Sequence, residues 1–182
     1  MFNKPIIGIM ATSLEGTIAK DGAIPWYYPD DLTHFKQLTK GQIMVMGRKT
    51  FETMPDSIFT DRVAIIFSRK PFLPRNSKYI NVHNIKDFFS VIKFLDKQKI
   101  IMVGGAEIAH LFLQENLITE FILTKINKSY LGDTHLNLAF FENWSKEILN
   151  SNDNYTIMRL IPNYLQNNKN MSEKSQNEIK KI

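Results

Sequence analysis

Six short apolar runs, separated by helical patterns and turn-forming residues, constrain most strongly what this chain can fold into. They lie at residues 5–11, 42–46, 62–67, 99–103, 120–126 and 155–161. Several are apolar at nearly every position, as in Ile-Ile-Met-Val at 100–103, which is typical of strands buried on both faces. Segments 30–39, 85–95 and 108–113 carry apolar residues at helical spacing. The alternation predicts a three-layer α/β fold with a central, mostly parallel sheet and helices on both faces, and ligands at the carboxyl ends of the strands.

Composition indicates one domain. The 182 residues, 43% of them hydrophobic, supply one sizeable core, so we assign residues 1–164 to a single catalytic domain and expect residues 165–182 to form a flexible polar tail. The sequence has no export signal, no apolar run of about 18 residues and no cysteine. We therefore expect a cytoplasmic monomer without a membrane partner, disulfide or metal site. The net charge of +5 is scattered along the chain, which argues against nucleic acid and favours an anionic small molecule.

Two carboxylates stand at the start of the predicted helix 30–39. Helix capping is the simplest interpretation, because acidic residues in a first turn stabilise a helix by about 0.3–1 kcal/mol. Spacing separates the two, since Asp31 shares a face with Phe35, whereas Asp30 shares its face with polar residues. Asp31 is expected to point inward, where loss of water is costly unless a ligand supplies paired N–H donors or the carboxyl takes up a proton. The edge of an aminopyrimidine ring has such donors.

This segment resembles the signature of the dihydrofolate reductase family, with Ile24-Pro25-Trp26, Asp31, Phe35 and Thr39 at the family's spacing. The resemblance implies a dihydrofolate-reductase-like fold, reduction of dihydrofolate to tetrahydrofolate with NADPH, and binding of antifolate inhibitors. It implies that Asp31 holds the pterin ring and promotes its protonation, that Trp26 helps to hold an ordered water, and that Ile24 lies in a mobile loop over the nicotinamide.

The resemblance also implies that Thr124 steadies Asp31 through a hydrogen bond, although a threonine on a strand is common without any such role. In the same way, Arg62 is either an exposed cation at a strand end or the partner of the α-carboxylate of the substrate's glutamate tail, for which a bidentate guanidinium is suited. The substrate contacts that we expect are Ala11, Asp31, Leu32, Phe35, Met54, Arg62 and Thr124.

Cationic and glycine-rich segments follow three of the predicted strands. Gly47-Arg48-Lys49-Thr50 begins a helical stretch, and Ser68-Arg69-Lys70 follows the run at 62–67. Backbone N–H groups at a helix start and adjacent cations can hold phosphate, although Arg-Lys pairs are common on any surface. Gly104-Gly105 is either an ordinary tight turn or a place where a pyrophosphate approaches the backbone.

These segments occur in the order of the family's cofactor motifs, and the resemblance implies that Arg48 reads the 2′-phosphate that distinguishes NADPH from NADH. Gly132-Asp133-Thr134 likewise resembles the family's loop that contacts the mobile loop near Ile24. The cofactor contacts that we expect are Ala11, Ile18, Gly47, Arg48, Lys49, Thr50, Ser68, Arg69, Lys70, Val103, Gly104, Gly105, Ala106, Glu107 and Ile108.

Three positions depart from the family's pattern and lead us to expect a slow enzyme. Ala19 replaces a usual Gly, Ala109 stands where a Tyr or similar residue lies beside the nicotinamide, and Glu107 occupies an often basic position. Two alternatives follow. One is an NADPH-dependent pyrimidine reductase of riboflavin biosynthesis, which residues 13–19 and 104–107 also resemble, and the other is a catalytically silent nucleotide-binding protein of the same fold. Asp31, together with Pro25-Trp26, favours dihydrofolate reductase, because the pyrimidine reductases generally lack this element.

Overall fold

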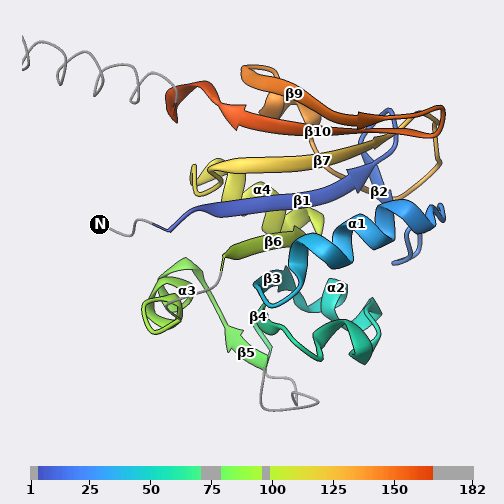
Figure 1. Ribbon diagram of the computed structural model, residues 1–182. Helices are drawn as coiled ribbons and strands as arrows, with labels where there is room; N and C mark the ends of the chain where they lie inside the picture. Colours follow the sequence, from blue (N-terminus) through green and yellow to red (C-terminus); the bar gives the residue numbers. More distant parts are fainter. Residues whose placement is uncertain (1–3, 71–78, 96–98, 166–182) are drawn as a thin grey trace, which may run out of the picture.

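The computed structural model describes residues 4–70, 79–95 and 99–165. Within them, eight strands form one sheet in the order β5-β4-β3-β6-β1-β7-β10-β9 (Figure 1). Their bounds are β1 Ile6–Thr12, β3 Ile43–Gly47, β4 Val63–Phe67, β5 Tyr79–Val82, β6 Ile100–Gly104, β7 Glu120–Ile126, β9 Trp144–Ser151 and β10 Tyr155–Pro162. The strands from β5 to β7 pair in parallel, and β10 is antiparallel to both β7 and β9. The predicted mostly parallel sheet is thus confirmed.

Helices cover both faces of this sheet, as predicted (Figure 1). On one face lie α1 (Pro29–Thr39), α2 (Arg48–Thr53) and the 3-10 helix η1 (Asp56–Phe59), and on the other lie α3 (Ile85–Ile92) and α4 (Ala106–Gln114). A second 3-10 helix, η2, spans Leu138–Phe141. No helix in the described part of the chain is long and apolar enough to cross a membrane.

The central strands are apolar throughout because each contributes to two cores. In β3, Ile43 and Val45 pack into the core beneath α3 and α4, whereas Met44 and Met46 pack into the core beneath α1 and α2. All four side chains are fully buried. Burial of a large aliphatic side chain is worth about 1.5–3 kcal/mol, so both faces of the sheet are held firmly and the strand ends have fixed positions.

The structure contains strands that the sequence pattern did not indicate. These are β5, β9 and a separate two-stranded ribbon of β2 (Thr17–Ala19) and β8 (Thr134–His135). Six of the eight residues of β9 are exposed to solvent. The strand therefore lacks the apolar run that identifies a buried strand. The predicted helix 85–95 ends earlier, at Ile92, and the predicted helix 108–113 starts earlier, at Ala106. The predicted tail beyond Leu165 lies outside the described residues.

Candidate active site

The strand registers bring the predicted cofactor motifs to one edge of the sheet. Gly47, the last residue of β3, pairs with Phe67 at the end of β4, and Met46 pairs with Gly104 at the end of β6. Because these strands are parallel, the residues that follow them emerge side by side. The segments 47–50, 68–70 and 104–108 are therefore neighbours, although they are far apart in the sequence.

The turn from β6 into α4 has no room for side chains. Gly104 has a φ of +110°, which favours glycine, and a Cβ at this position would lie 3.2 Å from the Cε of Met10. A Cβ on Gly105 would lie 3.0 Å from the Oγ1 of Thr50 on α2. Gly105 is also the N-cap of α4 and makes no side-chain cap hydrogen bond. Backbone amides at such a helix start can receive an anionic group, so this turn fits a dinucleotide phosphate.

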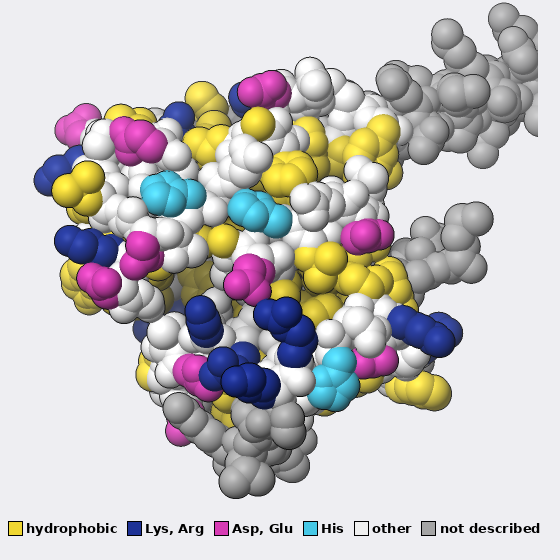
Figure 2. Space-filling view, turned by 180° about the vertical axis from the view of Figure 1, so that it is seen from behind, with side chains coloured by type: hydrophobic (Ala, Val, Ile, Leu, Met, Phe, Trp, Pro, Cys, Tyr) yellow, Lys and Arg dark blue, Asp and Glu magenta, His cyan; other side chains and the backbone are white. Residues whose placement is uncertain are grey.

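A groove of about 500 Å³ opens beside this turn, between the end of β4 and the starts of α3 and α4. It includes the predicted residues Ser68, Arg69, Glu107 and Ile108. Its further lining residues are Phe67, His83, Asn84, Ile85, Lys86 and Leu111. Figure 2, which views the molecule from behind, shows Lys and Arg side chains gathered on this side with acidic and His side chains among them.

His83 and Lys86 were not predicted, because they follow the short strand β5, which the sequence pattern did not reveal. The Nδ1 of His83 lies 2.8 Å from the carbonyl oxygen of Ser68. A carbonyl oxygen only accepts, so Nδ1 carries the hydrogen and Nε2 is the free ring nitrogen. The signal that could have located these residues is the Asn84 N-cap, whose side chain accepts from the amide of Asp87 at the start of α3.

Arg48 and Lys49 lie at the start of α2. The Nη1 of Arg48 donates to both carboxylate oxygens of Glu52, at 2.7 and 2.9 Å. This pair is one helical turn apart and half exposed, so it is weak and can open. Lys49 is exposed. Arg48 can therefore turn toward a bound phosphate at little cost. The groove cations are Arg69, which follows β4, and Lys86, at the start of α3.

On the opposite face of the sheet, Asp31 occupies the first turn of α1 and is partly buried, whereas Asp30 is exposed. The inward orientation predicted from spacing is confirmed. Burial raises the pKa of Asp31, while a hydrogen bond with the Thr124 hydroxyl and the nearby His34 lower it in part. Thr124 is buried on β7 and pairs with Ala11 of β1. A carboxyl in this setting can accept N–H groups from a ligand or retain a proton.

Apolar and aromatic side chains surround this end of α1. Trp26, Tyr28, Phe35, Met54 and Tyr130 pack against one core cluster. Trp26 and Phe35 were predicted site residues, as was Met54. Tyr130 was not, because it stands in the loop after β7 with no motif to mark it. Among the other predicted residues, Ile18 is buried in β2, Leu32 is 39% exposed, and Ile24 is 64% exposed.

The segment at residues 132–134 contacts the chain that precedes α1, but the hydrogen bonds lie at residues 19–21 rather than at Ile24. The amide of Asp21 donates to Oδ2 of Asp133 at 2.8 Å, and the amide of Asp133 donates to the carbonyl oxygen of Ala19 at 3.1 Å. The Asp21 amide and the Thr134 hydroxyl lower the pKa of Asp133. Ala19, which stands where the family usually has Gly, is thus compatible with the hydrogen bond between its carbonyl oxygen and the Asp133 amide.

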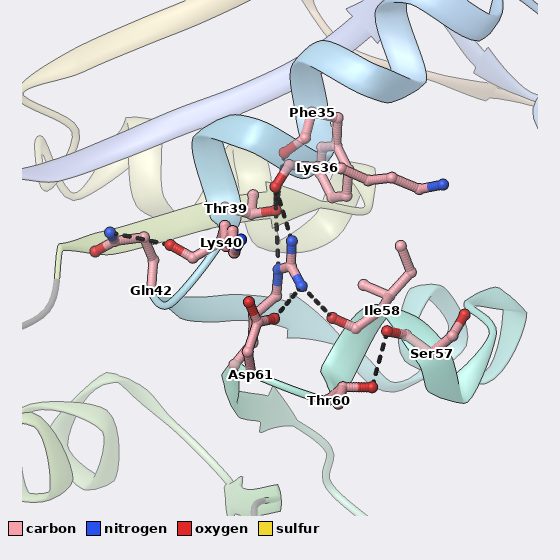
Figure 3. Close-up of polar contacts among 10 residues, drawn as sticks. Phe35, Lys36, Thr39, Lys40, Gln42, Ser57, Ile58, Thr60 and Asp61 are labelled. Atoms are coloured by element: carbon pink, nitrogen blue, oxygen red, sulfur yellow. Dashed lines mark hydrogen bonds and ion pairs between the residues drawn. The ribbon is translucent and has the colours of Figure 1, made fainter.

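Arg62 is buried rather than exposed, and its guanidinium joins α1 to η1 (Figure 3). Its Nε donates to Oγ1 of Thr39 at 3.1 Å, its Nη2 donates to the carbonyl oxygen of Lys36 at 2.7 Å, and its Nη1 donates to the carbonyl oxygen of Ile58 at 2.7 Å. Nη1 also pairs with the carboxylate of Asp61. These bonds use four of the five N–H groups of a guanidinium.

An open groove of about 410 Å³ lies over this guanidinium. It is lined by Thr33, Lys36, Gln37, Lys40, Ser57, Ile58, Asp61 and Arg62. With two lysines beside Arg62, the groove favours an anionic group. Among the described residues, no three His, Asp or Glu side chains gather in a way that could hold a metal ion.

Comparison with known proteins agrees with this arrangement. A family model described as dihydrofolate reductase matches residues 5–160. The dihydrofolate reductase of Lactococcus lactis subsp. lactis is 34% identical over 138 residues, covering 74% of this chain and 79% of that protein. Dihydrofolate reductase type 8 of Escherichia coli is 34% identical over 140 residues, covering 72% and 79%. The dihydrofolate reductase of Haemophilus influenzae is 34% identical over 140 residues, covering 76% and 82%.

Proposed function

The chain belongs to the dihydrofolate reductase family, and from this premise we propose that it reduces 7,8-dihydrofolate to 5,6,7,8-tetrahydrofolate with hydride from NADPH. The observation that carries the proposal is the partly buried carboxyl of Asp31, whose pKa is raised by burial and whose partner is the Thr124 hydroxyl. A pterin ring presents paired N–H groups to such a carboxylate, and the charge-assisted hydrogen bonds offset its lost hydration.

In this proposal Asp31 acts on the proton side of the reaction. It accepts the amino and ring N–H groups of the pterin and, with an ordered water that Trp26 helps to hold, promotes protonation of the nitrogen beside the carbon that receives hydride. Thr124 fixes the carboxyl orientation from β7. Ile24, in the loop before α1, closes over the nicotinamide and excludes water.

The two surfaces proposed to contact the substrate lie on the same face of the sheet. Ala11, Leu32, Phe35 and Met54 contact the rings, and Arg62 pairs with the α-carboxylate of the glutamate tail in the groove beside α1. Because only one N–H of Arg62 is unassigned, a bidentate grip requires Asp61 to release Nη1. The side chain of Asp61 is 41% exposed, so it can move into water.

The dinucleotide, when bound, supplies the hydride. We propose that its phosphates lie against the Gly104-Gly105 turn and the start of α4, with Val103, Ala106 and Ile108 beside them. Gly47, at the end of β3, and Thr50, on α2, lie beside the same turn. We propose that the 2′-phosphate is bound by Arg48 and Lys49 together with Ser68, Arg69 and Lys70. Glu107 lines the same groove as Ser68 and Arg69. Ala11 and Ile18 complete the cofactor contacts near the nicotinamide.

We further propose that residues 1–164 form the catalytic domain, with a polar tail over 165–182, and that the protein is a cytoplasmic monomer that binds antifolate inhibitors. The sequence has no cysteine, so the fold does not depend on a disulfide. The partly buried carboxyl supports antifolate binding, because a protonated diaminopyrimidine would pair with it.

Two substrates test the function. With purified protein and NADPH, we expect the absorbance of the reduced nicotinamide to fall when dihydrofolate is added and to stay constant with the pyrimidine substrate of the riboflavin pathway. Turnover of the pyrimidine alone would overturn the proposal and leave Asp31 only as a first-turn carboxylate that stabilises α1.

The cofactor preference has its own test. Arg48→Ala should raise the KM for NADPH about five- to tenfold and leave that for NADH nearly unchanged, since only NADPH carries the extra phosphate. Lys146→Ala is the matched control, because it removes an exposed cation from β9, the edge strand farthest from these motifs. Equal effects of Arg48→Ala on both cofactors would show that another residue reads the 2′-phosphate.

A further inference from the structure

Tyr130 lies in the loop between β7 and β8, on the side of the sheet that carries α1. Its ring packs on Trp26, with the two ring centroids 5.2 Å apart and the planes tilted by 55°. Such an aromatic pair is worth about 0.5–1.5 kcal/mol beyond the area that it buries. Both rings are half-buried against the core cluster that also contains Phe35. The Trp26 ring therefore packs against a residue that is distant in the sequence.

The hydroxyl of Tyr130 reaches the start of α1 as well. It lies 3.4 Å from the hydroxyl of Tyr28, a long hydrogen bond in which either group can donate. Tyr28 is the N-cap of α1 but makes no side-chain cap bond, so its own side chain is directed to Tyr130 instead. Its ring also meets Tyr155 edge-on, at 6.0 Å. The bond with Tyr130 and burial raise the pKa of Tyr28, which favours the neutral form of Tyr28.

Tyr130 is itself held from three directions. Its carbonyl oxygen accepts from Oγ1 of Thr17 on β2 at 2.9 Å. The Nζ of Lys128 stands 5.4 Å from the ring centroid, which adds a cation–π contact. With the Trp26 ring on another side, the Tyr130 side chain has little freedom to rotate, so it can transmit the position of the β2–β8 ribbon to the residues around it.

We infer that Tyr130 is a positioning residue for the reductase, which holds Trp26 and the first turn of α1 so that Asp31 is placed for proton transfer. The inference rests on the proposed function but concerns a residue that touches neither the carboxyl of Asp31 nor any part of the cofactor site described above. Trp26 and Tyr28 flank the short loop into α1, and Tyr130 contacts both. Removing its ring frees both ends of this segment at once.

The surroundings of Trp26 can be followed by its fluorescence emission in a protein that has no other tryptophan. The chain has two tryptophans, so the substitution Trp144→Phe, in β9, leaves Trp26 as the reporter. In this background we would compare Tyr130→Phe, which keeps the ring, Tyr130→Leu, which removes it, Tyr28→Phe and the double variant Tyr28→Phe/Tyr130→Phe. Tyr27→Phe is the matched control, because Tyr27 is 77% exposed beside the same loop.

Tyr130→Leu should lower kcat about tenfold, as expected for a small misplacement of a reacting group, with the KM for NADPH unchanged. The emission of Trp26 should move to longer wavelength as the indole gains water. Tyr130→Phe should retain the emission and lower kcat about twofold, in keeping with the loss of one long hydrogen bond. The kcat of the double variant should be no lower than that of either single variant, because each single substitution already removes the hydrogen bond between Tyr28 and Tyr130.

The opposite results overturn the inference. If Tyr130→Leu keeps the kcat and the Trp26 emission of the Tyr27→Phe control, Tyr130 does not position the loop. If Tyr130→Leu fails to fold, the hydroxyl variants decide, since additive effects of Tyr28→Phe and Tyr130→Phe would exclude a shared bond. Absence of dihydrofolate turnover in the Trp144→Phe protein and the unmodified chain would instead contradict the proposed function, and the emission would still report the placement of Trp26.

Discussion

At the scale of single residues, the surroundings of Asp31 disfavour the ionised form of its carboxyl group. Its pKa in the folded protein is raised, chiefly by burial, so the protonated form stabilises the fold relative to the ionised form. That stabilisation is complete below the ordinary aspartate pKa of about 3.9 and is lost as the pH rises through the raised value. A side chain retained at such a cost is typical of a functional site.

Asp31→Asn should therefore increase the free energy of unfolding at pH 7 by up to about 1 kcal/mol, within the range usual for relief of an unfavourable active-site group. The gain should shrink as the pH is lowered toward about 4, where the wild-type carboxyl is also neutral. Urea unfolding at several pH values measures this. Asp30→Asn, at an exposed position, should show no such trend, and a less stable Asp31→Asn protein at pH 7 would refute the argument.

Asp61 gives a second prediction for a single residue, since its carboxylate occupies Nη1 of Arg62. In the proposed complex the glutamate tail of the substrate competes for the same N–H groups. Asp61→Asn should lower the KM for dihydrofolate about two- to fivefold, the range of an exposed ion pair, with kcat unchanged. Asp56→Asn, in η1 but outside the groove, serves as the control. A raised KM in Asp61→Asn would mean that Asp61 orients Arg62 rather than competing with the substrate.

At the scale of elements, hydrogen bonds join the two-stranded ribbon of β2 and β8 to the loop before α1. Gly132 sits where the ribbon is tightest, because a Cβ there would lie 2.2 Å from Cγ2 of Thr17 and 2.4 Å from the carbonyl oxygen of Ala19. Neither neighbour can move without displacing β2. The same ribbon supplies Thr17, the partner of Tyr130.

Gly132→Ala should therefore separate β8 from β2 and weaken the bond between the Asp21 amide and Asp133. We expect kcat to fall about tenfold or more, as for other sub-ångström misplacements near a reaction centre, while the circular dichroism of the main sheet is retained. Steady-state kinetics with both readouts checks this. An Ala variant with wild-type kcat would show that the ribbon does not influence the loop.

The sequence predicted those elements that are apolar on both faces or have helical spacing. All six predicted strands are present, because burial between two helical layers leaves a continuous apolar run in β3, β4 and β6. The edge strands β5 and β9 carry exposed positions and gave no such run. Because β5 was not predicted, His83 and Lys86 were also missed. They follow β5 and line the groove proposed for the cofactor.

At the scale of the whole molecule, the two proposed binding surfaces lie on opposite faces of the sheet. The turn proposed to hold the cofactor phosphates and its cationic groove lie toward α3 and α4, and Asp31 with the Arg62 groove lies toward α1 and η1. Sequence spacing could identify the inward carboxylate, because that depends on one helix. It could not find Tyr130, whose contacts with Trp26 and Tyr28 exist only once the β7–β8 loop has folded back over the start of α1.

Asp31 is the central residue of the proposed reductase, and the most direct test of its role is NADPH oxidation with dihydrofolate at two pH values. These are pH 7 and about pH 5, a value between the ordinary pKa values of carboxylates and histidine. We predict that Asp31→Asn lowers turnover at pH 7 by about a hundredfold or more, as for loss of an acid–base group. Part of the rate should return in acid, where solvent can protonate the substrate, and Asp30→Asn should match the wild type at both pH values. Turnover of the Asp31→Asn protein at the wild-type rate would contradict the account.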